Sequence, residues 1–311
     1  MSYNCITTIL QPFYNRYMQI KQIIKIYSAH LKAKSSSPIL DIELLLTKVL
    51  TKPKEYLFEY PEKKLTNSQF NQFKKLFRRR FKGEPIAYIL GHKEFYGLDF
   101  KVNRNVLIPR PETEILVEEI IKYHKSAIRN QQSVIGIIEI GVGSGAIIIA
   151  LAKNIQNTKF LATDISAKAL NIAKQNAKDN KAKIKFLKGN LLQPLNKIQN
   201  SAFVIQNSII TANLPYLDKK EENLLPSSDT IGLKFEPKLA YDGGSDGLKY
   251  FRQLFAQVQK YNLKPKAIFL EIGHKQGQRI KNLAKQALPK YKVQIIKDLC
   301  GHDRAVIISK F

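Results

Sequence analysis

Scarce residue types exclude several classes of protein. The sequence contains no tryptophan and two cysteines, Cys5 and Cys300, which are too far apart for a disulfide framework or a cysteine metal cluster. Its five histidines show no metal-ligand spacing, so we expect no structural zinc. No apolar run approaches the ~18 residues of a membrane span, and the first 30 residues lack a signal-peptide core. We therefore expect a cytoplasmic protein that makes no membrane contact.

Acidic residues are also scarce, which gives the chain a large positive charge. Lysine and arginine number 51 against 25 acidic residues, a net charge of +26. A charge of this size suits a partner rich in phosphates, such as the ribosome or another nucleic-acid surface. The abundance of lysine, isoleucine and asparagine would also follow from an AT-rich genome. Both interpretations stay open from the sequence alone.

The length of 311 residues suits two domains, and residues 1–90 are predicted to form a helical one. Ile20, Ile23 and Tyr27 recur at helical spacing. The Ser-Ser-Ser-Pro stretch at 35–38 breaks this helix, and Asp41–Leu50 begins another.

A third helix, beginning after residues 66–68, has two contrasting faces. One face is lined by Phe70, Phe73, Phe77 and Phe81. The other is basic, and six of the nine residues from Lys74 to Lys82 are cations. This basic run is either a solvated helix face or a contact surface for a nucleic-acid backbone.

Residues 91–110 are predicted to be a hairpin and linker. The stretch FYGLDFKV, residues 95–102, alternates apolar and polar positions next to a glycine. Pro109 and Pro111 end the extended part, and Thr113 is placed to cap the helix that follows.

Residues 111–311 are predicted to form an α/β domain. Continuous apolar runs such as VIGIIEI at 134–140 alternate with helical patterns such as SGAIIIALAKNI at 144–155. This alternation is typical of a parallel sheet with helices on both faces. The last two strands, in residues 292–298 and 304–311, are joined by a short loop and should pair antiparallel at the sheet edge.

The segment EIGVGSG, Glu139 to Gly145, lies between a predicted strand and a predicted helix. Its glycines allow a tight turn and the close approach of a ligand to the backbone. The segment lacks both the complete dinucleotide pattern G-x-G-x-x-G and the Gly-Lys-Ser/Thr of a phosphate loop. The turn could therefore bind another kind of nucleotide-like ligand.

Polar residues follow the next two strands at the same edge of the sheet. Asp164 lies about 20 residues beyond the glycines, where a carboxylate can accept both hydroxyls of an adenosine ribose. It could also cap the helix that follows. Asn190 and Leu191 end the next strand, where an adenine ring would lie. Together with the glycine turn, these residues favour S-adenosyl-L-methionine over a dinucleotide.

The stretch ANLPY, residues 212–216, ends the fourth predicted strand. A planar nitrogen is a poor nucleophile, and two acceptors for its N–H bonds would fix it and favour electron density on the nitrogen. We predict that these acceptors are the Asn213 amide oxygen and the Leu214 carbonyl, which Pro215 stiffens. Tyr216 can pack on a flat amide or base. The alternative is a simple turn with a core tyrosine.

With these motifs, the chain resembles the release-factor glutamine methyltransferase family. The matching stretches, in family order, are GEPIAYILGHKEFYGLDF, VLIPRPETE, EIGVGSGAI, TDIS, ANLPY and FEPKLAYDGGSDGL. The resemblance implies a class I S-adenosylmethionine-dependent methyltransferase fold, Rossmann-like with a seven-stranded mostly parallel sheet, behind a small helical substrate-docking domain. It also implies methylation of the side-chain amide nitrogen (N5) of the glutamine in the Gly-Gly-Gln motif of peptide-chain release factors.

The resemblance also assigns roles to individual residues. Cofactor binding would fall to Glu139, Gly141, Val142, Gly143, Ser144, Gly145, Asp164, Asn190, Leu191 and Asn213. Substrate binding would fall to Asn213, Leu214, Pro215, Tyr216 and Glu236, with Asn213, Pro215 and Tyr216 as the catalytic set. Arg110 and Glu112 lie in the segment that covers the cofactor pocket in this family. No metal is implied.

Leu214 departs from the usual family pattern, Asn-Pro-Pro-Tyr. The expected chemistry uses the backbone carbonyl at this position, so leucine should preserve it. The form Asn-Leu-Pro-Tyr also occurs in ribosomal-RNA adenine dimethyltransferases, which makes adenine N6 of a nucleic acid the alternative substrate. Those enzymes carry their helical domain after the methyltransferase domain and lack an IPRPETE-like stretch. The order of segments in this chain therefore favours glutamine.

Overall fold

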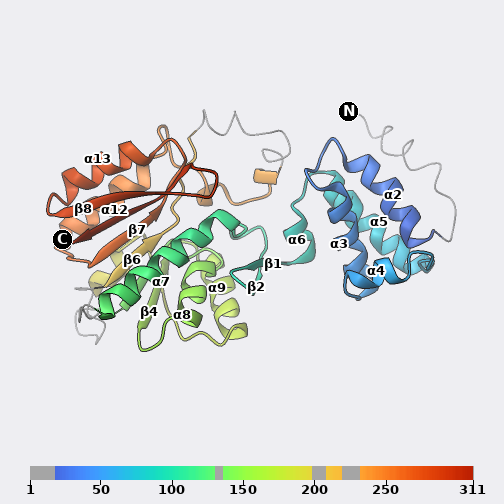
Figure 1. The fold of residues 1–311 in the computed structure, drawn as a ribbon, viewed down its shortest axis with the longest axis horizontal. Helices are drawn as coiled ribbons and strands as arrows, with labels where there is room; N and C mark the ends of the chain where they lie inside the picture. Colours follow the sequence, from blue (N-terminus) through green and yellow to red (C-terminus); the bar gives the residue numbers. More distant parts are fainter. Residues whose placement is uncertain (1–17, 130–135, 198–207, 219–231, 311) are drawn as a thin grey trace. The chain divides into compact units, whose positions relative to one another are not determined.

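A computed structural model describes residues 18–129, 136–197, 208–218 and 232–310 of the chain (Figure 1). Described residues up to Leu90 form one compact unit, and those from Gly91 onward form a second, except that Gly232 groups with the first. Cys5 lies outside the described residues. Among the helices of the described part, none has the length and apolar character needed to span a bilayer.

The first unit is helical, as the sequence predicts. Its helices are α2 (Ile20–Leu31), α3 (Pro38–Leu50), α4 (Glu55–Glu59), α5 (Asn67–Phe81) and α6 (Ile86–Leu90). Both predicted helices are present, but each begins earlier than predicted, α3 at Pro38 instead of Asp41 and α5 at Asn67, with Thr66 as its cap. The Thr66 hydroxyl accepts from Gln69 N at 3.2 Å and Thr66 N donates to Gln69 Oε1 at 2.9 Å. This reciprocal pair satisfies two backbone donors that the helix cannot satisfy itself.

The core of this unit is built around Tyr27. Its ring centroid lies 4.9 Å from that of Phe73 and 4.7 Å from that of Phe77, both edge-to-face. The predicted apolar face of α5 is confirmed for Phe70, Phe73 and Phe77, which are buried. Phe81 is only partly buried, and Lys34 Nζ lies 3.8 Å from its ring centroid.

The basic run of α5 is partly engaged within its own unit. Arg79 donates two hydrogen bonds to the Glu84 carboxylate, at 2.8 and 2.9 Å. Arg80 donates to Asp41 at 2.6 Å. Exposed cations of the run are Lys75, Arg78, Arg79 and Lys82. Contact of these cations with a nucleic acid stays a prediction.

The second unit begins with the predicted hairpin. Strands β1 (His92–Phe95) and β2 (Leu98–Lys101) pair antiparallel. Tyr96 and Gly97 connect them with φ of 52° and 72°, the positive values that a type I′ turn requires. The hairpin prediction is therefore confirmed.

A seven-stranded sheet follows, in the order β5-β4-β3-β6-β7-β9-β8. Its strands are β3 (Gly136–Ile140), β4 (Lys159–Asp164), β5 (Lys185–Lys188), β6 (Ile209–Ala212), β7 (Ala267–Glu271), β8 (Tyr291–Lys297) and β9 (Asp303–Lys310). The pairings among β3 to β7 are parallel, and β9 pairs antiparallel with both β7 and β8. The predicted mostly parallel sheet and antiparallel final pair are confirmed. However, β9 lies between β7 and β8, so of this final pair only β8 is an edge strand of the sheet.

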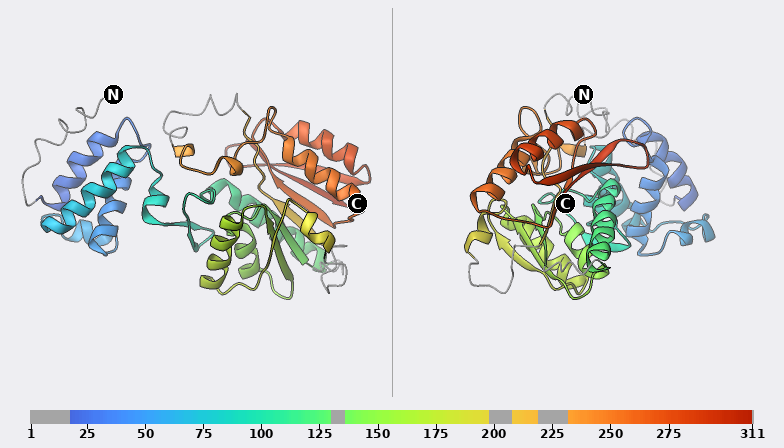
Figure 2. Two further views of the ribbon diagram at one scale, coloured as in Figure 1. Left: turned by 180° about the vertical axis from the view of Figure 1, so that it is seen from behind. Right: turned by 60° about the vertical axis from the view of Figure 1, so that its left-hand side comes forward.

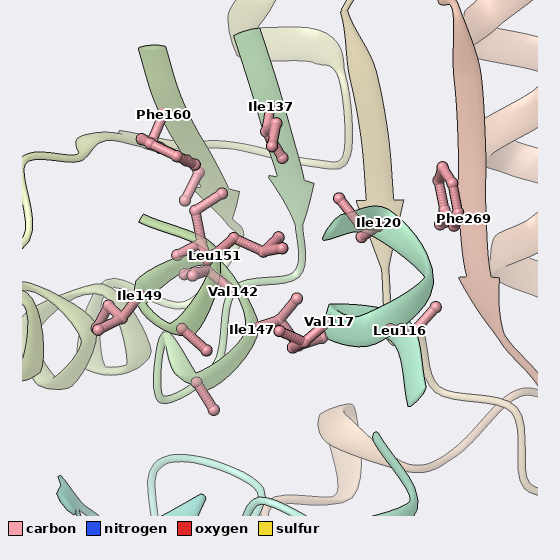
Figure 3. Close-up of a cluster of buried hydrophobic side chains, with 14 of the residues drawn as sticks. Leu116, Val117, Ile120, Ile137, Val142, Ile147, Ile149, Leu151, Phe160 and Phe269 are labelled. Carbon is pink, nitrogen blue, oxygen red and sulfur yellow. The ribbon is translucent and has the colours of Figure 1, made fainter. Parts of the chain in front are cut away.

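Helices cover both faces of this sheet (Figures 1 and 2). They are α7 (Glu114–Arg129), α8 (Ala146–Asn154), α9 (Ala167–Asp179), α12 (Lys249–Lys260) and α13 (Gly277–Ala287). Successive residues of β3 point to opposite faces. Ile137 joins the cluster formed with α7, α8 and α9, part of which Figure 3 shows, and Ile138 joins the cluster formed with α12 and α13. The doubly wound α/β prediction is confirmed, and the carboxyl ends of the parallel strands meet at one edge.

Candidate active site

A cavity opens at this carboxyl edge, where open α/β sheets bind ligands. Segments that follow β3, β4, β5 and β6 line it, together with residues 105–110. Further lining comes from Thr113, from Tyr250, and from Pro237, Leu239 and Ala240 at the short helix η4 (Lys238–Ala240). The predicted residues that line it are Arg110, Glu139, Gly141, Val142, Gly143, Ser144, Asp164, Asn190, Leu191, Asn213, Leu214 and Pro215. Those that do not are Glu112, Gly145, Tyr216 and Glu236.

The glycine segment turns sharply between β3 and α8. Gly141, Gly143 and Gly145 have φ of 72°, 53° and 85°, the left-handed region that a side chain disfavours. A Cβ built on Gly143 would meet no atom within 4 Å, so this backbone is open to a ligand. A Cβ on Gly145 would lie 2.9 Å from Ile149 Cδ1 and 3.4 Å from Ala173 Cβ. Gly145 therefore serves the packing of α8 and α9, and the residues before it form the cavity wall.

Asp164 ties this turn to the end of β4. Its Oδ2 accepts from Gly143 N at 3.0 Å, and its Oδ1 accepts from Ser166 N at 2.8 Å. The cap of α9 is Ser166, whose hydroxyl accepts from Ala169 N at 3.2 Å. Burial raises the pKa of Asp164, and the backbone hydrogen bonds oppose that shift. A carboxylate has about four lone-pair sites, so Asp164 can accept a further donor beside its backbone hydrogen bonds.

Glu139 is a second buried carboxyl group at the same edge. Its side chain lines the cavity, and its Oε2 accepts from Ile148 N at 2.9 Å. Burial raises the pKa of Glu139 well above its usual range, and the charge of Asp164 acts in the same direction. The hydrogen bond to Ile148 shows that Glu139 also supports the first turns of α8.

Asn190 and Leu191 lie beyond β5, as the sequence predicts. Leu191 has φ of 50°, an uncommon value for a residue with a side chain, and its carbonyl accepts from the Thr163 hydroxyl at 2.8 Å. That bond holds the turn against β4. Strained backbone of this kind is concentrated at ligand sites.

Asn213 follows β6, and its amide group is held by two neighbours. Its Nδ2 donates to Glu271 Oε2 at 2.9 Å and to the Thr113 hydroxyl at 3.3 Å. The amide nitrogen is thus directed at Glu271, and the amide oxygen points away from that carboxylate. Asn213 therefore offers the cavity an acceptor.

The other residues of the ANLPY segment contact the cavity, the hydrophobic core or both. Leu214 lines the cavity, yet its side chain is 2% exposed and packs in the cluster under α12. Tyr216 packs against the same cluster, and its hydroxyl donates to Glu271 Oε1 at 3.2 Å. Burial, with the adjacent Glu271 charge, raises the pKa of Tyr216. Packing of its ring on a substrate amide stays a prediction.

Glu236 joins two segments of the cavity lining. Its Oε1 accepts from Arg110 Nη2 at 2.5 Å and its Oε2 accepts from Ile108 N at 3.1 Å. The Glu236 side chain is 2% exposed, so these bonds account for its burial. Glu112 is exposed. A direct substrate role for Glu236 stays a prediction.

Thr113 and Glu271 are the contacts of Asn213 that sequence reasoning missed. Thr113 is the last residue of the short helix η2 (Pro111–Thr113) and immediately precedes α7, so the cap role expected for it stays a prediction. Glu271 is a carboxylate at the end of the apolar strand AIFLE, a placement as unusual as that of Asp164. Among the described residues, no group of three or more His, Cys, Asp or Glu side chains could hold a metal ion.

Comparisons with known proteins agree with this architecture. The PrmC N-terminal domain family matches residues 22–91, and a methyltransferase domain family matches residues 137–222. Among solved structures, the catalytic domain of human METTL16 in complex with a MAT2A 3′UTR hairpin is similar, with a TM-score of 0.52, 18% identity, and coverage of 76% of this chain and 82% of that one. That likeness concerns the fold.

Curated relatives extend over almost the whole chain. The release factor glutamine methyltransferase of Coxiella burnetii is 38% identical over 294 residues, 94% of this chain and 99% of the relative. That of Thermodesulfovibrio yellowstonii is 36% identical over 280 residues, 89% of this chain and 94% of the relative. The resemblance seen in the sequence motifs is confirmed, and the protein is an S-adenosylmethionine-dependent methyltransferase. The chain belongs to the release factor glutamine methyltransferase family.

Proposed function

We propose that this chain methylates the side-chain amide nitrogen (N5) of the glutamine in the Gly-Gly-Gln motif of peptide-chain release factors, a step that serves translation termination. The observation that carries the proposal is the orientation of the Asn213 amide. Its nitrogen donates to Glu271 at 2.9 Å and to Thr113 at 3.3 Å, which leaves the oxygen to accept from a substrate.

The cavity fits the cofactor of this family, S-adenosyl-L-methionine. The open backbone at Gly143 suits close approach of the ligand. Asp164 would accept the ribose hydroxyls, with Asn190 and Leu191 beside the adenine. Glu139, Val142 and Ser144 complete this wall. When bound, the cofactor would supply an electrophilic methyl group for the acceptor nitrogen, which would release one proton to water.

The substrate amide needs two acceptors. A glutamine amide nitrogen shares its lone pair with the carbonyl, so it reacts poorly until that pair is localised. Asn213 Oδ1 and the Leu214 carbonyl would accept its two N–H bonds, hold its plane and favour pyramidal nitrogen. Pro215 and Tyr216 would shape this part of the site.

We assign residues 1–90 to substrate docking, 91–110 to a hairpin linker and 111–311 to methyl transfer. The match of the N-terminal family model over residues 22–91 supports the first assignment. The exposed Lys75, Arg78 and Lys82 of the basic run are available for a release factor or for ribosomal RNA. A role in termination places the protein in the cytoplasm.

Adenine N6 of a nucleic acid is the competing substrate, since it is also a planar exocyclic amine. The relatives do not favour it, because release factor glutamine methyltransferases match nearly the entire chain. The test is to incubate the full chain with methyl-labelled cofactor and either a release factor or ribosomal RNA. We expect label in the factor, and none in a factor whose motif glutamine is replaced by alanine. Label in RNA and not in the factor would contradict the proposal.

Replacing Leu214 by proline, the usual family residue, should change turnover by less than about threefold, because the position acts through its carbonyl. The structure adds a cost, since the leucine side chain is 2% exposed and packed in the core. We expect the free energy of unfolding to fall by about 1 kcal/mol, the loss of apolar burial being partly offset by the stiffer unfolded chain. Denaturant titration and steady-state assays measure both quantities. A tenfold change in kcat with unchanged stability would show that the side chain itself acts in the reaction.

A further inference from the structure

We propose that Glu271 is a positioning residue for methyl transfer: its buried carboxylate determines which end of the Asn213 amide faces the substrate. The inference rests on the proposed function, because it concerns the acceptor that Asn213 offers. Glu271 acts through Asn213 and through no contact of its own with the substrate.

Sheet register brings the two residues together. Strands β6 and β7 are adjacent and parallel, with Ala212 paired to Leu270. Asn213 is the first residue after β6 and Glu271 is the last residue of β7, so the two lie side by side at the carboxyl edge. The resulting Nδ2–Oε2 distance is 2.9 Å. The strand pairing that ends at Ala212 and Leu270 therefore sets where these two residues begin.

The chemistry of the pair selects one orientation of the amide. An ionised carboxylate accepts hydrogen bonds and donates none. Glu271 receives Asn213 Nδ2 on one oxygen and the Tyr216 hydroxyl on the other, at 3.2 Å. Turning the amide over would set its oxygen against the carboxylate, two acceptors in a buried site. That arrangement is costly, so the nitrogen stays on Glu271 and the oxygen stays available to the substrate.

The pKa of the Glu271 carboxyl group is raised overall, and its neighbours act on it in both directions. The residue is 2% exposed, and burial raises its pKa, while hydrogen bonds from Thr113 and Tyr216 and the charge of Arg304 lower it. The exposed Glu112 acts weakly in the raising direction. Arg304 lies close to Glu271 because the next residue, Ala305 of β9, pairs with Glu271 of β7. The Arg304 guanidinium also donates a hydrogen bond to Asp298, at 3.0 Å.

Gln276, which lies between β7 and α13, holds the backbone of the ANLPY segment in place. Gln276 Nε2 donates to the Tyr216 carbonyl at 2.8 Å, and Gln276 Oε1 accepts from Gly273 N at 3.0 Å. A Cβ on Gly247 would lie 2.4 Å from the Tyr216 carbonyl oxygen, so this backbone is closely packed. A conservative change at Glu271 should therefore turn the Asn213 amide without moving the segment.

Glu271→Gln tests this directly. The Tyr216 hydroxyl would keep its bond to the glutamine oxygen, which leaves the glutamine NH₂ facing Asn213. Two donors would then meet, and the Asn213 amide would turn over and present its own NH₂ to the substrate. We expect kcat to fall about 10- to 100-fold, the range for losing a hydrogen bond to a charged group, while the Kd for S-adenosylmethionine changes less than about threefold.

A reciprocal variant separates orientation from structural damage. In N213D/E271Q, the NH₂ of the introduced glutamine would donate to one oxygen of the introduced aspartate, whose other oxygen would face the substrate, with the same net charge as the native pair. We expect the kcat of this double variant to be about tenfold higher than that of E271Q or N213D. The N213D variant is impaired because it sets two carboxylates against each other. The control is Glu119→Gln, which changes a partly buried carboxylate of α7 that is paired with Lys122 at 2.7 Å and lies outside the cavity lining; it should leave kcat unchanged. Normal kcat in E271Q, or a double variant no better than the single ones, would overturn the inference.

An NMR readout distinguishes failure of this inference from failure of the proposed function. In protein labelled with ¹⁵N-asparagine, the Asn213 NH₂ protons should exchange slowly with solvent in the native chain and about tenfold faster in E271Q. This measurement requires no substrate. If the native chain failed to methylate a release factor, the proposed function would fall, while the exchange result would still decide the Glu271–Asn213 contact. Equal exchange in both proteins would overturn it.

Discussion

Asn213→Ala is expected to lower methyl transfer to a release factor by about 100- to 1000-fold, the loss seen when an oriented polar group of a catalytic site is removed. The native side chain supplies one of the two acceptors for the substrate amide. Alanine would leave the substrate nitrogen free to rotate and its lone pair delocalised. It would also leave the Glu271 carboxylate without its Nδ2 donor in a buried position.

Cofactor binding provides the control for this variant. Asn213 contributes one side chain to a lining built mainly from the segments after β3, β4 and β5, so the Kd for S-adenosylmethionine should change less than about threefold. Isothermal titration measures that Kd. Asn154→Ala, an exposed asparagine that donates to the Ala150 carbonyl within α8, should leave both quantities unchanged. An equal loss of cofactor binding and transfer in Asn213→Ala would assign the residue to the cofactor alone.

Asn213 could be predicted from the sequence, but its hydrogen-bond partners could not. Asn213 is visible in the sequence because it ends an apolar run and precedes a proline. Its partners Thr113 and Glu271 lie 100 and 58 residues away. Glu271 becomes its neighbour only because β7 lies beside β6, and periodicity within a strand cannot reveal strand order.

Charged residues show the same limit. The run from Lys74 to Lys82 reads as uniformly basic, yet Arg79 and Arg80 are paired with Glu84 and Asp41. Glu236 was expected at the substrate, whereas both of its oxygens are bonded to the segment of residues 108–110. A sequence gives the sign of each charge, but pairing depends on long-range approach. By contrast, the glycine turn and Asp164 needed only local pattern, because each lies at the end of a recognisable strand.

Asp164→Ala is expected to weaken S-adenosylmethionine binding about 100-fold, which corresponds to roughly 2.7 kcal/mol, a value within reach of two lost charge-assisted hydrogen bonds. Two effects combine in this variant. The ribose would lose its acceptor, and the glycine turn would lose the bond from Gly143 N to Asp164 Oδ2 at 3.0 Å. Because the Asn213 site is untouched, kcat at saturating cofactor should stay within about tenfold of the native value.

Asp164→Asn and a distant control separate these two effects. Asparagine keeps one acceptor oxygen, but its NH₂ would face either Gly143 N or Ser166 N, so about a tenfold loss of affinity is expected. Asp179→Ala removes an exposed aspartate paired with Lys101 and should leave the Kd unchanged. Isothermal titration calorimetry measures the Kd for S-adenosylmethionine of each variant and so tests this order of affinities. A lowered kcat with unchanged cofactor affinity would contradict the assignment, because Asp164 would then act on the reaction and not on the cofactor. The predicted order follows from geometry, since Asp164 is the side chain that links the open Gly143 backbone to the end of β4.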